Sequence, residues 1–366
     1  MNPMSGTLPE QQKPALDPTQ KIWQRFLNIP RVLEQALATK VGGTPHDVVY
    51  EEDSLKLLRY RRETPAAYVE PVLICYALVN RPYILDLQPE KSVVRQLLNR
   101  DFEVYLIDWG VPTAADQSLR LHDYICGRMK RIADFVVERE KVPHFNLLGY
   151  CMGGTMSAMF AAVYPELVKN LILLAAPIDF SGRETLVNLW ADEKYFDVDA
   201  LIDTFGNCPA EFLQNIFLIM KPVQNLVEKY YTFCNKMDDP RFVESFVAME
   251  TWVNDNIPVA GETFREYVKN LYQRNQLVKG EFRLNDIPVK LDRITCPLLL
   301  LTARDDHLVA PSSTEGITPH VKTTDIKSMM IKAGHIGLAV SSKAQKEFWP
   351  AATRWIADRC TPRPPA

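Results

Sequence analysis

The chain reads Gly149-Tyr150-Cys151-Met152-Gly153-Gly154-Thr155 where an apolar strand pattern gives way to a helical pattern. The run at 145–148 predicts a buried strand, and residues 152–163 predict the helix that leaves it. A nucleophile on such a tight strand-to-helix turn has a strained backbone, so its neighbours two positions away on either side must be small. Gly149 and Gly153 meet that requirement, which makes Cys151 the candidate nucleophile of an elbow.

Two further motifs follow the elbow in the order nucleophile, acid, histidine, which is the chain order of an α/β-hydrolase fold. A carboxylate pair, Asp305 and Asp306, stands shortly after one predicted strand, and His335 follows another on a glycine-flanked loop. His307 is adjacent to the acid, but neighbouring side chains on an extended segment point apart, so we expect it to have a structural role. The sequence therefore predicts a triad of Cys151, one of the two aspartates, and His335.

An oxyanion hole in this fold uses two backbone N–H groups, one from the residue after the nucleophile and one from the loop after an early strand. Met152 is the first of these donors. The loop at 78–83 follows the predicted strand at 72–77 and supplies the second. We predict that this donor is Val79, with Asn80 as the alternative.

Short apolar runs alternate with helical stretches from about residue 48, as in a mostly parallel sheet covered by helices on both faces. Strands are predicted at 72–77, 104–107, 145–148, 171–174, 297–301 and 329–331. After residue 178 the pattern turns helical and rich in aromatic residues, which we assign to core packing of an inserted, mainly helical cap. The predicted segments are a leader with an amphipathic helix (1–42), the first part of the hydrolase core (43–180), the cap (181–288) and the second part of the core (289–366).

The composition excludes several classes of protein. The 42 basic and 45 acidic residues are interspersed and give a net charge of −3, so no broad field attracts nucleic acid or an anionic membrane. The sequence has no signal-peptide pattern and no apolar run of membrane-span length, and its seven cysteines form no C-x-x-C pair. We therefore predict a cytoplasmic protein without a membrane span, a disulfide framework or structural zinc.

A cysteine nucleophile favours one class of reaction. An acyl group on cysteine is a thioester, so exchange with a substrate thioester keeps the acyl group activated, whereas a seryl ester would lose part of that activation. Transfer from a thioester to an alcohol therefore suits cysteine, while hydrolysis works equally well with serine. The sequence favours an acyltransferase.

Taken together, the motifs resemble those of the polyhydroxyalkanoate synthases, specifically the short catalytic subunits of class III, with class IV as the second choice. The likeness extends from about Gly43 over nearly the whole chain. It rests on the runs at 76–83, 106–110, 147–154, 203–207, 260–265, 306–309 and 334–337. The family pattern has an aspartate directly before a histidine, so the resemblance assigns the triad to Cys151, Asp306 and His335.

The resemblance implies that the chain polymerises (R)-3-hydroxyacyl-CoA, with 3-hydroxybutyryl-CoA as the expected substrate, into a polyester with release of CoA and without a cofactor or metal. Cys151 would hold the acyl group until a 3-hydroxyl attacks it. Asp306 would orient His335, activate that hydroxyl, or do both. The resemblance further implies a second, non-catalytic subunit, a homodimer, and a place at the surface of cytoplasmic polyester granules.

Two alternatives stay open at this stage. A cysteine hydrolase of the same fold, such as an acyl-CoA thioesterase or a polyester depolymerase, would share the triad and let water reach the acyl-enzyme. A catalytically silent homologue that binds polymer or partner subunits would have no use for an intact triad. The product of the reaction separates the first alternative from a synthase, and a Cys151→Ala protein that still supports polymer formation would establish the second.

Overall fold

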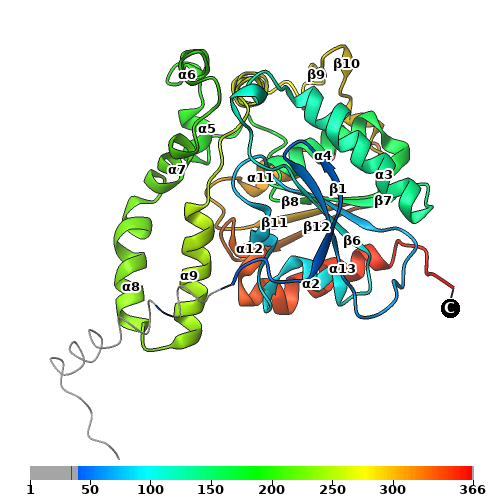
Figure 1. Ribbon diagram of the computed structural model, residues 1–366. Helices are drawn as coiled ribbons and strands as arrows, with labels where there is room; N and C mark the ends of the chain where they lie inside the picture. Colours follow the sequence, from blue (N-terminus) through cyan, green and yellow to red (C-terminus); the bar gives the residue numbers. More distant parts are fainter. Residues whose placement is uncertain (1–33, 35–39, 365–366) are drawn as a thin grey trace, which may run out of the picture.

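The structure is a computed structural model that describes residue 34 and residues 40–364 (Figure 1). The predicted leader and amphipathic helix at 1–42 therefore lies almost entirely outside the described residues. Within the described part of the chain, no helix has both the length and the apolar composition needed to cross a membrane.

The centre of the protein is an eight-stranded sheet in the order β1-β2-β6-β3-β7-β8-β11-β12. Its strands are β1 (His46–Glu52), β2 (Leu55–Tyr60), β3 (Val72–Cys75), β6 (Val104–Asp108), β7 (Phe145–Tyr150), β8 (Val168–Leu174), β11 (Leu298–Ala303) and β12 (Ile326–Ile331). β2 pairs antiparallel with β1 and β6, and all other neighbours in the sheet are parallel. The mostly parallel sheet expected from the sequence is confirmed.

The strands that the sequence predicts lie in the parallel part of the sheet. β3, β7 and β11 are buried at every residue, because helices cover both faces, and this burial produces their continuous apolar runs. The β1–β2 hairpin is not among the strands predicted from the sequence. The side chains of β1 are only half buried or exposed, so its sequence mixes apolar and charged residues and its apolar run is limited to residues 48–50.

Core helices cover both faces of the sheet. They are α2 (Val93–Leu98), α3 (Lys130–Glu140), α4 (Met152–Val163), α11 (Pro311–Glu315), α12 (Gly337–Val340) and α13 (Trp349–Ala357). Figure 1 shows α3 and α4 on one side of the sheet and α2, α12 and α13 on the other. The helix predicted to leave the elbow is α4, which begins directly after Cys151.

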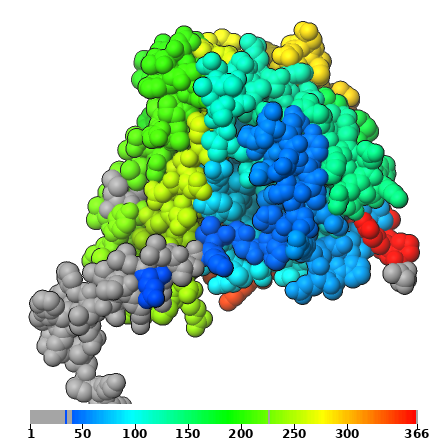
Figure 2. All heavy atoms as spheres, viewed as in Figure 1, coloured from blue at the N-terminus to red at the C-terminus, as the bar shows by residue number. Residues whose placement is uncertain are grey.

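A group of helices, called the cap below, follows β8 and precedes β11. Its helices are α5 (Leu186–Trp190), α6 (Val198–Phe205), α7 (Ala210–Ile219), η5 (Val223–Glu228), α8 (Lys229–Lys236), α9 (Pro240–Asn254), α10 (Gly261–Glu266) and η6 (Tyr267–Gln273). In Figure 1, α7, α8 and α9 extend along one edge of the sheet, and Figure 2 shows the yellow-green residues of α9 beside the blue and cyan residues of the core. Two short strands, β9 (Arg283–Leu284) and β10 (Ile287–Pro288), lead back to the core. The division into four segments given above stays a prediction.

The N-terminus of α9 has strong local determinants. Pro240 occupies the first turn, where its missing N–H costs nothing, and the side chain of Asp239 accepts hydrogen bonds from the backbone N–H groups of Arg241 and Phe242. The helix then runs for 15 residues and ends at Asn254, with Asp255 directly after it. The fixed bounds of α9 place the residues at its C-terminal end, including Asp255, against the core.

Candidate active site

The candidate nucleophile stands at the end of β7 with an unusual backbone. Cys151 has φ 54 and ψ −127, a conformation that costs free energy for any residue with a side chain. Its N–H donates to the carbonyl oxygen of Leu174 at 2.9 Å, and its own carbonyl oxygen accepts from the N–H of Gly154 at 2.8 Å. Packing between β7, β8 and α4 therefore holds the strained turn in place.

The glycines around the elbow are required by close contacts. A Cβ atom on Gly149 would lie 2.5 Å from the Cα of Gly154, and one on Gly153 would lie 2.3 Å from the carbonyl oxygen of Cys75. These distances are shorter than any van der Waals contact, and the atoms met are backbone atoms that cannot rotate away. The small neighbours that the sequence pattern calls for are thus explained by the packing of α4 against β3 and β7.

Replacing Gly153 with alanine is expected to lower the free energy of unfolding by about 3 kcal/mol, because the new methyl group overpacks a rigid backbone contact. Gly43→Ala is the matched control, since a Cβ atom at Gly43 meets nothing within 4 Å. Urea denaturation of the two variants and the wild type measures the difference. Equal stability of Gly153→Ala and the wild type would show that the elbow relaxes around the methyl group.

The predicted acid and base meet at the same edge of the sheet. Asp306 follows β11 and His335 follows β12, and these neighbouring parallel strands bring the two side chains together. The Nδ1 atom of His335 lies 2.7 Å from one carboxylate oxygen of Asp306. The other oxygen accepts from the N–H groups of Leu308 at 2.8 Å and Val309 at 3.0 Å. The side chain of Asp306 is 0% exposed and that of His335 6%.

The electrostatics of this pair favour its charged forms. Burial alone would raise the pKa of Asp306, but His335 and the hydrogen bonds to the carboxylate hold it below its ordinary value. Burial alone would lower the pKa of His335, yet the Asp306 carboxylate raises it, and the sulfur of Cys151 acts in the same direction as a charge and hydrogen-bond partner. The raised pKa of His335 suits it to accept a proton at the side of the sulfur, as a general base for a thiol must.

Asp305 and His307, the neighbours of Asp306 that could be mistaken for the acid and the base, lie in different surroundings. The side chain of Asp305 is 51% exposed and pairs with its neighbour Arg304 at 3.2 Å. His307 has a buried Nδ1 atom that finds no hydrogen-bond partner in the described part of the chain. Burial, followed by the charge of Lys221, lowers the pKa of His307 to about 4. The structure therefore brings Cys151, Asp306 and His335 together and leaves Asp305 at the surface.

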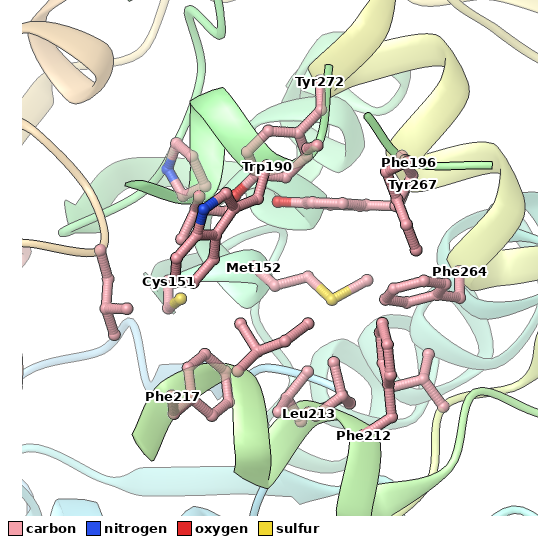
Figure 3. Close-up of a pocket in the computed structure, with 18 of the residues that line it drawn as sticks. Cys151, Met152, Trp190, Phe196, Phe212, Leu213, Phe217, Phe264, Tyr267 and Tyr272 are labelled. Atoms are coloured by element: carbon pink, nitrogen blue, oxygen red, sulfur yellow. The ribbon is translucent and has the colours of Figure 1, made fainter. Parts of the chain in front are cut away.

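Cys151 opens into an apolar cavity of about 400 Å³ (Figure 3). Figure 3 shows the sulfur at one end of the cavity and a wall of aromatic rings along it, and none of the described residues that line it carries a charge. The rings come from the cap and the residues next to it: Trp190, Tyr195, Phe196, Phe212, Phe217, Phe264, Tyr267 and Tyr272. The sequence predicted that the aromatic residues of the cap pack in the core. Most of these rings do pack against the core, but they also form the wall of the cavity, a second role that apolar periodicity does not reveal.

The two predicted oxyanion donors lie beside the nucleophile. Met152 and Val79 both line the cavity into which Cys151 opens, and Val79 follows β3, the strand next to β7 in the sheet. Asn80, the alternative donor, is absent from the described wall of the cavity. Its φ of 64 places it in the left-handed region.

Comparison with solved structures identifies the fold. A putative lipase from Sulfolobus solfataricus matches with a TM-score of 0.54 and 14% identity, over 86% of this chain and 99% of that chain. The monoacylglycerol lipase of Paleococcus ferrophilus matches with a TM-score of 0.52 and 16% identity, over 82% of this chain and 99% of that chain. Residues 70–340 match the family model of the alpha/beta hydrolase fold. The predicted α/β-hydrolase fold is confirmed.

Comparison with curated sequences identifies the family. Residues 31–97 match the model of the poly-beta-hydroxybutyrate polymerase (PhaC) N-terminus. Proteins named poly(3-hydroxyalkanoate) polymerase subunit PhaC are similar to this chain in Haloferax mediterranei (44% identity over 89% of this chain and 66% of that protein), Allochromatium vinosum (40%, 93% and 98%) and Synechocystis sp. (38%, 96% and 94%). The chain thus spans about two thirds of the Haloferax protein and nearly the full length of the other two. On this evidence the chain belongs to the PhaC family of poly(3-hydroxyalkanoate) polymerase subunits.

Proposed function

We propose that this chain is the catalytic subunit of a class III polyhydroxyalkanoate synthase, which polymerises (R)-3-hydroxyacyl-CoA, chiefly 3-hydroxybutyryl-CoA, with release of CoA. One observation carries the proposal: a cysteine at the elbow, next to a buried Asp306–His335 pair, opens into a cavity whose described wall is uncharged. The similarity to PhaC proteins of nearly equal length supports the assignment to the short, two-component type.

In the first half-reaction, His335 takes the thiol proton of Cys151 through Nε2, because Nδ1 is engaged by Asp306. The sulfur attacks the thioester carbonyl carbon, and the resulting oxyanion accepts hydrogen bonds from the N–H groups of Met152 and Val79. Collapse of this intermediate breaks the carbon–sulfur bond to CoA. The CoA sulfur leaves with the proton held by His335, and the acyl group stays on Cys151.

In the second half-reaction, the 3-hydroxyl of a hydroxyacyl unit attacks the Cys151 thioester. Its proton passes to His335 and then to the cysteine sulfur, so one ester bond forms and one thioester bond breaks. The balance for each unit added is one acyl-CoA consumed and one CoA thiol released. Water would compete with the hydroxyl, and the apolar wall of the cavity disfavours water near the acyl group.

Within this mechanism we assign Asp306 the role of orienting His335. Both of its carboxylate oxygens already accept hydrogen bonds, from His335 and from the N–H groups of Leu308 and Val309. Its side chain is fully buried, which leaves no direct path for a substrate hydroxyl. His335 is therefore the group that accepts the hydroxyl proton.

The proposal includes a second, non-catalytic subunit, a homodimer and a place at the surface of polyester granules in the cytoplasm. The names of the relatives, each of which is called a polymerase subunit, support the dependence on other subunits. Exposed apolar side chains on the cap, Val223, Val227 and Tyr231, offer contact area for such partners or for polymer.

Incubation of the purified protein with (R)-3-hydroxybutyryl-CoA tests this function. We expect one CoA thiol for each ester unit formed, with insoluble polyester as the product and faster CoA release when the second subunit is co-expressed. Thiol titration measures CoA, and mass spectrometry after methanolysis identifies the polyester. Release of CoA with only free 3-hydroxybutyrate would instead identify a thioesterase.

A further inference from the structure

Three hydrogen bonds join the loop that carries Val79 to the C-terminal end of the cap helix α9. The indole N–H of Trp252 donates to the carbonyl oxygen of Arg81 at 2.8 Å. Two bonds reach Asp255: the Nε of Arg81 donates to Oδ1 at 3.3 Å, and the hydroxyl of Tyr83 donates to Oδ2 at 3.0 Å. These partners are 171 to 174 positions apart in the sequence, and Trp252 is only 5% exposed.

The loop has a strained conformation that needs external support. Asn80 stands between Val79 and Arg81 with φ 64, and its side-chain oxygen is buried without a hydrogen-bond partner in the residues that the structure describes. A non-glycine residue keeps such a conformation only where its surroundings hold it there. The contacts from α9 reach Arg81, which directly follows Asn80, and Tyr83, which lies in the η1 turn (Pro82–Leu85). They therefore supply that support.

Trp252 also contacts the other side of the site. The polar indole N–H of Trp252 lowers the pKa of the Tyr76 hydroxyl, although burial, the larger effect, raises that pKa well above its ordinary value. The ring of Tyr76 lies 5.7 Å from that of Tyr150, and the ring of Tyr150 stacks on His335 at 5.1 Å. The hydroxyl of Tyr150 donates to the carbonyl oxygen of His335 at 3.3 Å. Trp252 thus bonds to the loop of Val79, and its indole acts electrostatically on Tyr76, which packs through Tyr150 against the base His335.

We propose that Trp252 and Asp255 are positioning residues: the end of α9 sets the loop of Val79, so that the oxyanion hole is complete only when the cap is docked. This inference rests on the proposed function, in which Val79 donates to the oxyanion. It makes the rate of acylation depend on the position of the cap, because a shift of α9 withdraws the second donor. Neither Trp252 nor Asp255 touches the reacting atoms.

Asp255→Ala and Trp252→Phe test the proposal in the full-length protein. The first removes the two bonds that Asp255 accepts from Arg81 and Tyr83, and the second keeps most of the ring volume but loses the third bond, from the indole N–H to Arg81. We expect the first-turnover release of CoA to slow by about 100-fold, as for a misplaced catalytic group, with little change in KM. The rate at which iodoacetamide alkylates Cys151 should stay unchanged, because attack on an alkyl halide forms no oxyanion.

Ser245→Ala is the matched control. It removes another bond between α9 and the core, from Lys91 Nζ to Ser245 Oγ at 2.6 Å, without touching the loop. This variant should release CoA at the wild-type rate. A double-mutant cycle with Tyr83→Phe and Asp255→Ala should show that the two losses do not add, because both remove the same contact.

Three results would overturn the inference: wild-type acylation in both positioning variants, an equal loss in Ser245→Ala, or a parallel loss of alkylation rate. The last would mean that α9 holds the thiol or the fold rather than the oxyanion loop. Unchanged melting temperatures establish that the variants are folded. The product made by the wild type reports separately on the proposed function, since first-turnover CoA release is measurable for a synthase and a thioesterase alike.

Discussion

Cys151→Ala is expected to reduce CoA release from (R)-3-hydroxybutyryl-CoA by roughly 10⁴- to 10⁶-fold and to abolish polyester formation. Without the sulfur, no acyl-enzyme can form. His335 and the oxyanion donors then have no transition state of acyl transfer to Cys151 to stabilise, so the loss is of this size. The strained turn should persist, since alanine has the same Cβ atom as cysteine and meets the same neighbours. Thiol titration of released CoA and isolation of polymer measure the outcome.

Cys234→Ala is the control for this experiment, because it removes a free thiol that is exposed on α8. It should retain the full rate of CoA release. Polyester made by the Cys151→Ala protein would show that the nucleophile lies elsewhere. The chain would then be a silent partner of another polymerase, as the second alternative from the sequence allows.

Asp306→Asn is expected to slow CoA release by roughly 10⁴-fold while leaving the protein folded, by analogy with the same change in serine-protease triads. The asparagine oxygen can still accept from the N–H groups of Leu308 and Val309, so its amide group then faces Nδ1 of His335. The imidazole must then carry its proton on Nε2, next to the sulfur, where it cannot accept another. Alkylation of Cys151 by iodoacetamide should slow as well, in contrast to the effect of Asp255→Ala.

Asp305→Asn is the matched control, since it makes the same change one residue earlier on an exposed side chain. It should leave both CoA release and alkylation unchanged. The stage at which Asp306→Asn fails separates the two roles considered for this residue. A variant that releases the first CoA at the normal rate but adds no further units would show that Asp306 activates the hydroxyl, against the orienting role proposed above.

Much of the fold could be predicted from the sequence, because runs of apolar residues indicate which segments are buried. The continuous apolar runs of β3, β7 and β11 exist because helices cover both faces of these strands, and each run predicted a strand. The half-buried β1 has only three consecutive apolar residues between charged ones, and its place beside β2 was not predicted. The bounds of each strand also shifted by a few residues, because strand ends depend on pairing partners rather than on local composition.

The residues of the site also differ in whether local sequence could predict them. The identity of Cys151 as the candidate nucleophile follows from the glycines around it, since a strained turn between a strand and a helix leaves a local signature. The choice between Asp305 and Asp306 needed the resemblance to a family. The structure gives it a physical basis, because only Asp306 is buried against His335.

The sequence by itself therefore determined the elbow, the order of the triad motifs and the mostly parallel sheet, because these depend on the residue types within short segments. Only the tertiary structure decided that the aromatic residues of the cap enclose a cavity above Cys151 and that Trp252 and Asp255 hold the loop of Val79. Contacts between segments more than 170 positions apart leave no periodic pattern in either segment. They arise when the sheet order and the docking of α9 bring those segments together.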